Sequence, residues 1–223
     1  KTVAGYIKSC QGTPNLGDPI DPLYLMRLPA AAVVNEAQLA YGANKIADAN
    51  RLFKEAAIVA EPDDLRVLNG LYLTNWRLGK QREAGETFRR IATLGIAARL
   101  LPLKILFAPG KAQPVPVPDL QAQYSLWVRE VAQVSQAGNA CLKVIGHTSR
   151  SGSPTANEAL SVQRAAYVRA RLVTSASKLR GKVDADGVGS RENLIGLGTD
   201  DLRDLLDRRV EFRVNDCAAP KAS

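Results

Sequence analysis

The segment that most constrains the fold joins a short apolar strand to a helix through a turn-rich loop. Residues 142–146 (LKVIG) are apolar and rich in β-branched side chains, which predicts a buried strand. The loop at 149–155 (SRSGSPT) contains one glycine, one proline and three serines, a composition typical of turns. After this loop, the apolar pattern predicts a helix from about residue 157 to residue 174.

An arginine lies on the apolar stripe of that predicted helix. At 100° per residue, Asn157, Ser161 and Arg164 fall in one narrow sector, beside Leu160 and Val168. A guanidinium there cannot point freely into water, and burying it unpaired would cost on the order of 3–5 kcal/mol. We therefore expect Arg164 to have a carboxylate partner, either from the protein or from a ligand.

Four groups of residues together resemble the OmpA-like peptidoglycan-binding domain of outer-membrane and flagellar-motor proteins. That family's pattern is G-H-T-D, a glycine soon after, N-x-x-L-S-x-x-R-A, and much later N-R-R-V. The matching residues are Gly146-His147-Thr148-Ser149, Gly152, Asn157-Glu158-Ala159-Leu160-Ser161-Val162-Gln163-Arg164-Ala165 and Asp207-Arg208-Arg209-Val210. The first block keeps its spacing without a gap, and the resemblance covers roughly residues 103–216, about half the chain.

The resemblance implies non-covalent attachment to the bacterial cell wall. In the family, the Asp of G-H-T-D binds the ammonium of diaminopimelate in the stem peptide, the Arg binds its carboxylate, and the Asn helps to complete the site. Arg164 and Asn157 match the Arg and the Asn, which favours ligand contact over a structural ion pair for Arg164. The binding residues that the resemblance implies are Arg164, Asn157, His147, Thr148, Ser149, Gly152, Leu160 and Arg208.

The sequence departs from the family where Ser149 replaces the Asp. An ammonium that faces a hydroxyl loses a charge-assisted hydrogen bond of roughly 1.5–3 kcal/mol, which corresponds to a tenfold to hundredfold loss of affinity. A neighbouring carboxylate such as Glu158, Asp200 or Asp201 could replace the charge. Asp207, where the family has Asn, is another candidate. Otherwise the ligand differs, or the domain has lost wall binding.

His147 is the single histidine of the chain. We favour a structural role with hydrogen bonds to the backbone, because a nucleophile at Ser149 or Ser161 would need an acid to orient the imidazole, and no such spacing stands out. One histidine and three scattered cysteines also argue against a metal site. The sequence thus predicts no enzymatic activity, no cofactor and no metal.

The sequence pattern of the C-terminal half, residues 102–217, predicts an α/β domain. Strand patterns alternate with helical patterns, and a proline-rich segment at 109–118 excludes both helix and regular strand. This order predicts a mixed sheet with helices on one face. The resemblance implies the β-α-β-α-β-β sandwich of OmpA-like domains. The predicted strands are 103–107, 142–146, 183–188 and 209–214, and the predicted helices are 119–136, 157–174 and 200–207. On the last strand, a solvated face explains Arg209, Glu211 and Arg213.

The sequence pattern of the N-terminal half, residues 29–101, predicts an all-α domain. Residues 72–95 resemble a tetratricopeptide repeat, with Gly79 at the turn between helices and Ala84 and Phe88 at the small and aromatic positions. A weaker unit precedes it, with Ala49 and Phe53 at those positions. Two units favour either a binding surface for a protein partner or a small bundle packed on the next domain. Residues 1–28 are expected to be an extended lead-in, and 218–223 a tail.

The charge and the cysteines of the chain limit its possible partners and its cellular compartment. The net charge is +8, but the cations are spread along both halves without a basic recognition helix, which argues against nucleic acid. No apolar stretch approaches the roughly 20 residues of a membrane span. A disulfide between Cys141 and Cys217 would suit an oxidising periplasm, although two free thiols are equally compatible with the sequence. Cys10 is the odd cysteine, and a lipoprotein anchor would have to lie upstream of Lys1.

These observations predict a periplasmic, outer-membrane-associated protein of the cell envelope. The C-terminal domain would bind the diaminopimelate-type stem peptide of peptidoglycan, and the helical repeats would bind a protein partner. The alternative, kept open by Ser149, is a scaffold component of a secretion or motor-type envelope complex. In that case the OmpA-like fold would have lost or altered its wall binding.

Overall fold

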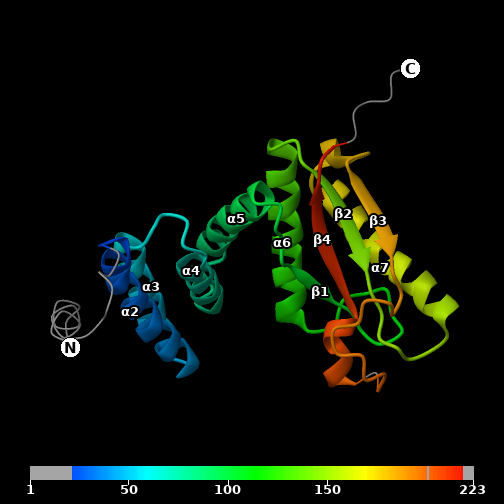
Figure 1. The fold of residues 1–223 in the computed structure, drawn as a ribbon, viewed down its shortest axis with the longest axis horizontal. Helices are drawn as coiled ribbons and strands as arrows, with labels where there is room; N and C mark the ends of the chain where they lie inside the picture. The colour runs from blue at the N-terminus through cyan, green and yellow to red at the C-terminus, as the bar shows by residue number, and fades with distance from the viewer. Residues whose placement is uncertain (1–21, 200, 218–223) are drawn as a thin grey trace. The chain divides into compact units, whose positions relative to one another are not determined.

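The chain divides into two compact units, residues 1–91 and 92–223, in the computed structural model (Figure 1). The structure describes residues 22–199 and 201–217. The sequence places the domain boundary at residue 101, whereas the division between the units falls inside helix α5 (Gln81–Ala97).

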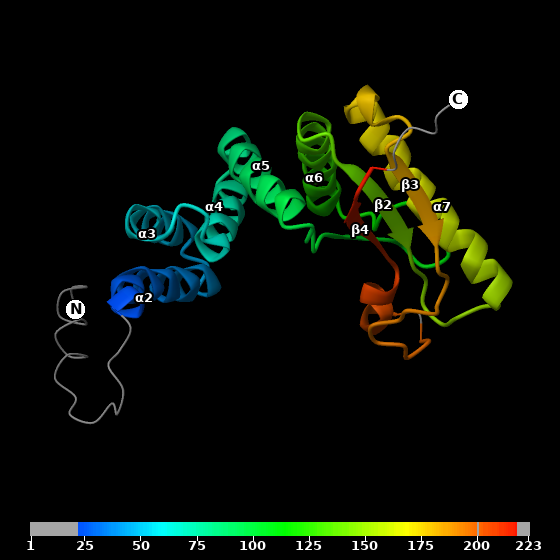
Figure 2. The same ribbon diagram turned by 45° about the horizontal axis from the view of Figure 1, so that its top comes forward.

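The N-terminal region is helical, as the sequence predicts. It contains α2 (Pro22–Gly42), α3 (Ile46–Val59), α4 (Leu65–Arg77) and α5, and α2 packs beside α3 (Figure 2). The extended conformation expected up to residue 28 is wrong for residues 22–28, which belong to α2. Proline is well suited to the first turn of a helix, so Pro22 begins α2 rather than preventing it. Residues 1–21 of the expected lead-in, with Cys10, and the expected tail at 218–223 lie outside the described residues.

Small and aromatic side chains form the contacts between these helices. Phe53 of α3 is 3% exposed, and a Cβ atom added to Gly70 of α4 would lie 2.2 Å from its ring, so the two helices approach closely. Phe88 of α5 packs against Tyr72 of α4, with ring centroids 5.3 Å apart. Gly79 has φ +71° in the turn between them, a conformation that favours glycine. This packing is compatible with the proposed repeat pattern.

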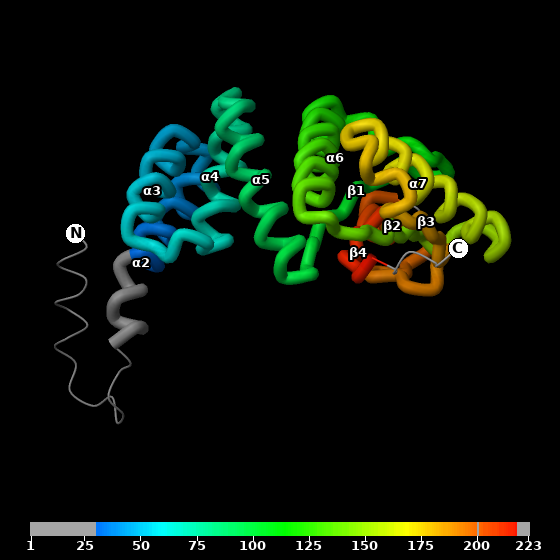
Figure 3. The backbone as a smooth tube through the Cα atoms, turned by 90° about the horizontal axis from the view of Figure 1, so that it is seen from above, coloured from blue at the N-terminus to red at the C-terminus, as the bar shows by residue number. Residues whose placement is uncertain are grey.

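The C-terminal unit has the predicted β-α-β-α-β-β order, which confirms the expected fold class. Its strands are β1 (Lys104–Leu106), β2 (Cys141–Gly146), β3 (Val183–Gly187) and β4 (Arg209–Asn215), in the sheet order β1-β4-β2-β3. Strand β2 runs parallel to β3, and β4 is antiparallel to both β1 and β2. Helices α6 (Pro118–Ala137) and α7 (Pro154–Ser175) pack together on one side of the sheet (Figure 3). Two short 3-10 helices, η1 (Ser177–Leu179) and η2 (Leu202–Asp207), complete the unit.

Both long helices of this unit begin earlier than the sequence pattern predicts. Helix α6 begins at Pro118, and Asp119, the first residue of the predicted helix, lies in the first turn and accepts a hydrogen bond from the Gln123 side chain. Helix α7 begins at Pro154, where the Ser153 hydroxyl accepts from the main-chain N–H of Ala156. The reason is the same in both cases, because proline at the first helical position has no N–H to leave unsatisfied.

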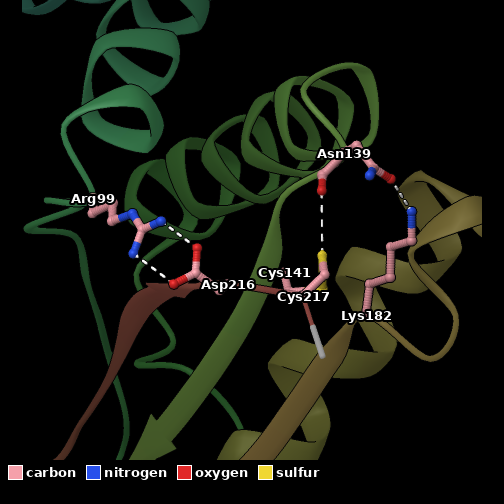
Figure 4. The surroundings of a disulfide bond; sticks show 6 residues. All are labelled: Arg99, Asn139, Cys141, Lys182, Asp216 and Cys217. Carbon is pink, nitrogen blue, oxygen red and sulfur yellow. Dashed lines mark hydrogen bonds and ion pairs between the residues drawn. A yellow bond between two sulfur atoms is a disulfide. The ribbon is translucent and has the colours of Figure 1, made fainter. Parts of the chain in front are cut away.

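A disulfide joins Cys141, the first residue of β2, to Cys217, two residues beyond β4, with their Cα atoms 5.1 Å apart (Figure 4). An ion pair between Arg99 and Asp216 and a hydrogen bond from Lys182 to Asn139 lie on either side of it. These interactions fix the end of the sheet that is opposite to the carboxyl end of β2.

Candidate functional site

The residues directly after β2 are buried and held by neighbouring loops. His147, Thr148 and Ser149 are 0%, 2% and 4% exposed. The main-chain N–H of His147 donates to the carbonyl of Arg209 at 2.9 Å, and that of Thr148 donates to Gly189 at 2.9 Å. The loop is therefore fixed between the start of β4 and the segment after β3.

Arg164 of α7 joins two loops that are distant in sequence. Its side chain is 0% exposed, and it donates to the carbonyl oxygens of Lys111 at 2.9 Å, His147 at 2.8 Å and Ala108 at 3.0 Å. The guanidinium also lies over the Phe107 ring, 5.4 Å from its centroid. All three of these acceptors are main-chain carbonyl oxygens, whereas the sequence reasoning expected a carboxylate. Hydrogen bonds from a charged group stabilise by about 1.5–3 kcal/mol each, so Arg164 is a major determinant of the shape of both loops.

The other polar residues in the same sector of α7 hold further loops. Asn157 donates from its amide to the carbonyl of Ser151 at 2.9 Å. Ser161 donates to Glu158 in its own helix at 2.7 Å and accepts from the main-chain N–H of Gly189 at 2.9 Å. Asn157, Ser161 and Arg164, which the sequence places on one helix face, thus hold the loops at the carboxyl end of β2.

Ser149, which stands where the family has Asp, is buried close to another hydroxyl. Its Oγ lies 3.2 Å from the Oγ of Ser151. Two of the carboxylates considered as replacements for the family Asp have other partners: Glu158 pairs with Arg191 at 3.1 Å, and Asp201 pairs with Arg203 at 2.7 Å. Asp200, the third of them, lies outside the described residues.

Asp207, the fourth candidate, shapes the loop before η2. Its carboxylate is 0% exposed and accepts from the main-chain N–H groups of Leu194 at 2.6 Å, Ile195 at 3.0 Å and Gly196 at 2.7 Å. Burial acts to raise the pKa of this carboxyl, but the hydrogen bonds outweigh burial and hold the pKa below its usual value. The three donors fix both carboxylate oxygens, so Asp207 acts as a structural acceptor.

The two arginines of the closing motif are buried. Arg208 is 2% exposed and donates to the carbonyl oxygens of Phe107 at 3.3 Å and Asp201 at 3.0 Å. Arg209 is 2% exposed and pairs with Glu211 at 2.7 Å. The solvated strand face predicted for Arg209 is wrong, because the connection between β3 and β4 covers it: the main-chain carbonyl of Glu192 accepts from its guanidinium at 3.2 Å.

The His147 ring is buried without hydrogen bonds. Both of its nitrogens lack a partner among the described residues, and Nε2 is 3.8 Å from Oε2 of Glu211. The ring is therefore structural without the backbone hydrogen bonds that the sequence reasoning assigned to it. Burial, together with the charge of Arg209, lowers the pKa of His147 to about 4, so the imidazole is neutral at pH 7.

Two buried polar atoms near this loop have no partner in the described part of the chain, Oγ1 of Thr148 and Oδ1 of Asn193. They belong to adjacent groups, because the amide nitrogen of Asn193 donates to the main-chain carbonyl of Thr148 at 2.8 Å. Buried polar groups are normally hydrogen-bonded, so these atoms are candidates for ligand contact. Sequence reasoning missed Asn193, which belongs to no motif and approaches the loop only in the folded chain.

The remaining predicted site residues lie around this centre. Gly152 adopts φ +88° in the loop before α7, which favours glycine, and Leu160 is half-buried on α7. In the described residues, no cluster of three histidine, cysteine, aspartate or glutamate side chains is suited to a metal ion. The arrangement provides hydrogen-bonding groups and a buried positive charge.

A comparison with family models matches residues 106–203 to the OmpA family. The C-terminal half of this chain contains an OmpA-family domain. The match begins at the last residue of β1 and spans both long helices, the loop at His147–Ser149 and Arg164. No curated protein gives a significant match to the chain.

Solved structures similar to the OmpA-family domain share low sequence identity with it. The peptidoglycan-associated lipoprotein of Burkholderia pseudomallei is 20% identical with a TM-score of 0.43, covering 50% of this chain and 89% of that chain. A periplasmic domain of Helicobacter pylori MotB is 16% identical with a TM-score of 0.40, covering 51% and 71%. The OmpA-like domain of Francisella tularensis FopA1 is 18% identical with a TM-score of 0.37, covering 52% and 75%.

Among the described helices, none is long and apolar enough to cross a membrane.

Proposed function

We propose that the OmpA-family domain binds peptidoglycan non-covalently through the loop at His147–Ser149, in the periplasm and in association with the outer membrane. The observation that carries the proposal is Arg164, which matches the family's binding arginine and holds both the 108–111 loop and His147. Family membership over residues 106–203 supports the same conclusion. No covalent step is part of this function, so no enzymatic activity and no cofactor are proposed.

In this proposal, different groups of the site contact different parts of a diaminopimelate stem peptide. The buried positive charge of Arg164 favours a ligand carboxylate beside the loop, because charges interact more strongly in the low-dielectric interior than in water. The unpaired Oγ1 of Thr148 and Oδ1 of Asn193 accept ligand N–H groups. Ser149 takes the ligand ammonium through a neutral hydroxyl, which accounts for a weaker site than an aspartate would give.

Co-sedimentation with purified diaminopimelate-type sacculi tests this function directly. The wild-type protein should pellet with the sacculi in a saturable manner. Ser149→Asp should bind roughly tenfold to a hundredfold more tightly, because a charge-assisted hydrogen bond to the ammonium contributes about 1.5–3 kcal/mol. Ser149→Asn is the matched control, since it has a similar size without the charge, and it should bind like the wild type.

Two results would count against the proposal. A wild-type protein that stays in the supernatant at all sacculus concentrations would overturn wall binding. If Ser149→Asp and Ser149→Asn bind equally, no ammonium lies at this position, and the stem peptide would not be the ligand of this loop.

The second candidate function is a protein scaffold within an envelope complex. Three leucines of the connection between β3 and β4 support it: Leu194, Leu197 and Leu202 are 51%, 55% and 83% exposed, and exposed apolar groups in one segment are typical of interaction surfaces. The helical N-terminal region, which we propose as a binding surface for a protein partner, fits either role. The sacculus assay separates the candidates, because the scaffold requires no wall binding by either the wild type or Ser149→Asp.

A further inference from the structure

A second concave region of the OmpA-family domain lies between α6 and α7, outside the loop site. A cavity of about 250 Å³ opens there, lined by side chains of β1, the loop after it, α6 and α7. Tyr167 lines this cavity and also packs edge-on against Phe107, with centroids 6.3 Å apart. The guanidinium of Arg164 lies over the Phe107 ring, so an aromatic ring separates the cavity from the loop site.

The floor of the cavity is apolar. Ile105 of β1, Val128 of α6 and Val168 of α7 line it, and they are 2%, 5% and 1% exposed. The rings of Tyr124 and Tyr167 add aromatic surface. Apolar area removed from water contributes roughly 25 cal/mol per Å², so this floor favours an apolar or aromatic group. The Tyr124 hydroxyl accepts from the main-chain N–H of Leu106 at 3.3 Å and is thereby held in place.

The rim of the cavity carries a guanidinium without an acidic partner. Arg171 donates to the Ser125 hydroxyl at 3.4 Å and lies 5.7 Å from the centroid of the Tyr167 ring. Within the described residues it forms no ion pair, although other arginines of this unit, such as Arg191 and Arg213, are paired with carboxylates. A planar, exposed guanidinium next to an aromatic ring is well suited to binding a carboxylate through two hydrogen bonds.

We propose that this cavity binds a small monocarboxylate with an apolar or aromatic body. The body would lie on Ile105, Val128 and Val168 between the two tyrosines, and the carboxylate would pair with Arg171. Gln113 and Gln121 also line the cavity, and the Gln121 amide donates to the main-chain carbonyl of Val115 at 3.3 Å. Their side chains would form hydrogen bonds with polar groups of the ligand. A cavity of about 250 Å³ is smaller than typical drug-sized sites, so the ligand is either a free small acid or the C-terminal residue of a peptide.

Chemical-shift titration of the full-length, isotope-labelled protein tests this site with two probes, phenylacetate for a free acid and N-acetyl-alanyl-phenylalanine for a peptide C-terminus. Each has a neutral counterpart, phenylacetamide and the corresponding peptide amide. We expect saturable shifts at residues 113–114, 121–128 and 167–171 with at least one of the acids. A ligand of about ten heavy atoms that gains roughly 0.3–0.4 kcal/mol per atom binds with a millimolar dissociation constant.

Arg171→Gln is the decisive variant, because the side chain is exposed and its replacement leaves the floor of the cavity intact. It should weaken binding of the acid about tenfold or more, since a hydrogen bond to a charged group contributes roughly 1.5–3 kcal/mol. Arg180→Gln removes the same charge from another exposed position of the domain and should leave the affinity unchanged.

The proposal is overturned if neither acid gives saturable shifts at these residues, if the neutral amides bind as tightly as the acids, or if Arg171→Gln and Arg180→Gln have equal effects. If only the peptide binds, the natural ligand is a peptide C-terminus, and if only phenylacetate binds, it is a free acid. The result is independent of wall attachment, because Arg171→Gln should co-sediment with sacculi as the wild type does.

Discussion

At the scale of single residues, we expect His147 to make this domain sensitive to acid. Its ring is buried and neutral, with both nitrogens unpaired in the described structure. Burial is the main cause of the low pKa of this ring, and the positive charges of Arg209 and Arg213 oppose protonation more than Glu211 and Asp207 favour it. The free-energy cost of protonating this ring therefore arises from the folded domain itself.

The consequence is a loss of stability as the pH falls. The pKa of His147 is about 4 in the folded chain and about 6.5 when unfolded, so the unfolded state binds more protons between these values. The free energy of unfolding should be constant above about pH 6.5 and should fall by about 2 kcal/mol between pH 7 and pH 5. Urea unfolding at several pH values measures this change.

His147→Gln provides the comparison, because a glutamine does not titrate in this range. The variant is expected to be less stable at pH 7 but to show little change down to pH 5. If wild type and variant lose stability in parallel, another group causes the acid sensitivity and the assignment to His147 is wrong.

The residue scale also shows where sequence reasoning succeeds and where it stops. Helical periodicity places Arg164 on the buried face of its helix, and the structure has it there with no exposed surface. The carbonyl acceptors at Ala108 and Lys111 were not predictable, because they come from a loop more than 50 residues away. A helical pattern fixes the direction of a side chain but not the identity of the groups that it meets.

At the scale of elements, the site depends on how closely β2 approaches α7. A Cβ atom added to Gly146, the last residue of β2, would lie 1.9 Å from the carbonyl oxygen of Ser161. Only glycine permits this distance, and it brings the loop after β2 within reach of Arg164. The sequence marked Gly146 as part of a motif, whereas its physical reason is visible only with the helix in place.

Gly146→Ala should therefore separate β2 from α7. We expect a destabilisation of about 1–3 kcal/mol, the usual effect of overpacking a well-packed core, together with loss of sacculus binding. Gly138→Ala is the matched control in the same unit, since its added methyl would lie 3.4 Å from the Val134 carbonyl at an ordinary φ of −83°. Equal unfolding free energies for the two variants, measured in urea, would show that the close approach does not limit stability.

Element boundaries differ from their predictions for local reasons. The pattern of apolar residues identifies both long helices of the OmpA-family domain, but it gives their first residues one to three positions too late, because prolines at 118 and 154 begin them. Arg209 shows a different limit. The alternation of residue types along β4 predicts that Arg209 lies on an exposed face. In the structure, the connection between β3 and β4, which has no regular pattern in the sequence, covers Arg209.

At the scale of the whole molecule, the two units differ in what stabilises them. The described helices of the N-terminal unit depend on packing such as that of Phe53 against Gly70. The C-terminal unit adds a covalent link, Cys141–Cys217, across 76 residues. The sequence alone was equally compatible with this disulfide and with two free thiols. The two cysteines are adjacent only because β4 lies next to β2 in the sheet, and the sequence does not show that order.

Loss of this link should destabilise the C-terminal unit alone. A cross-link across 76 residues restricts the unfolded chain, and disulfides of this kind typically contribute about 2–4 kcal/mol. In urea, the double variant Cys141→Ser/Cys217→Ser should shift the transition of the OmpA-family domain, followed by near-ultraviolet signals of Trp127, while the transition of the helical unit, followed by Trp76, stays in place. Cys10→Ser retains the disulfide and should match the wild type. If both transitions shift together, the two units unfold as one cooperative body and their stabilities are not separable.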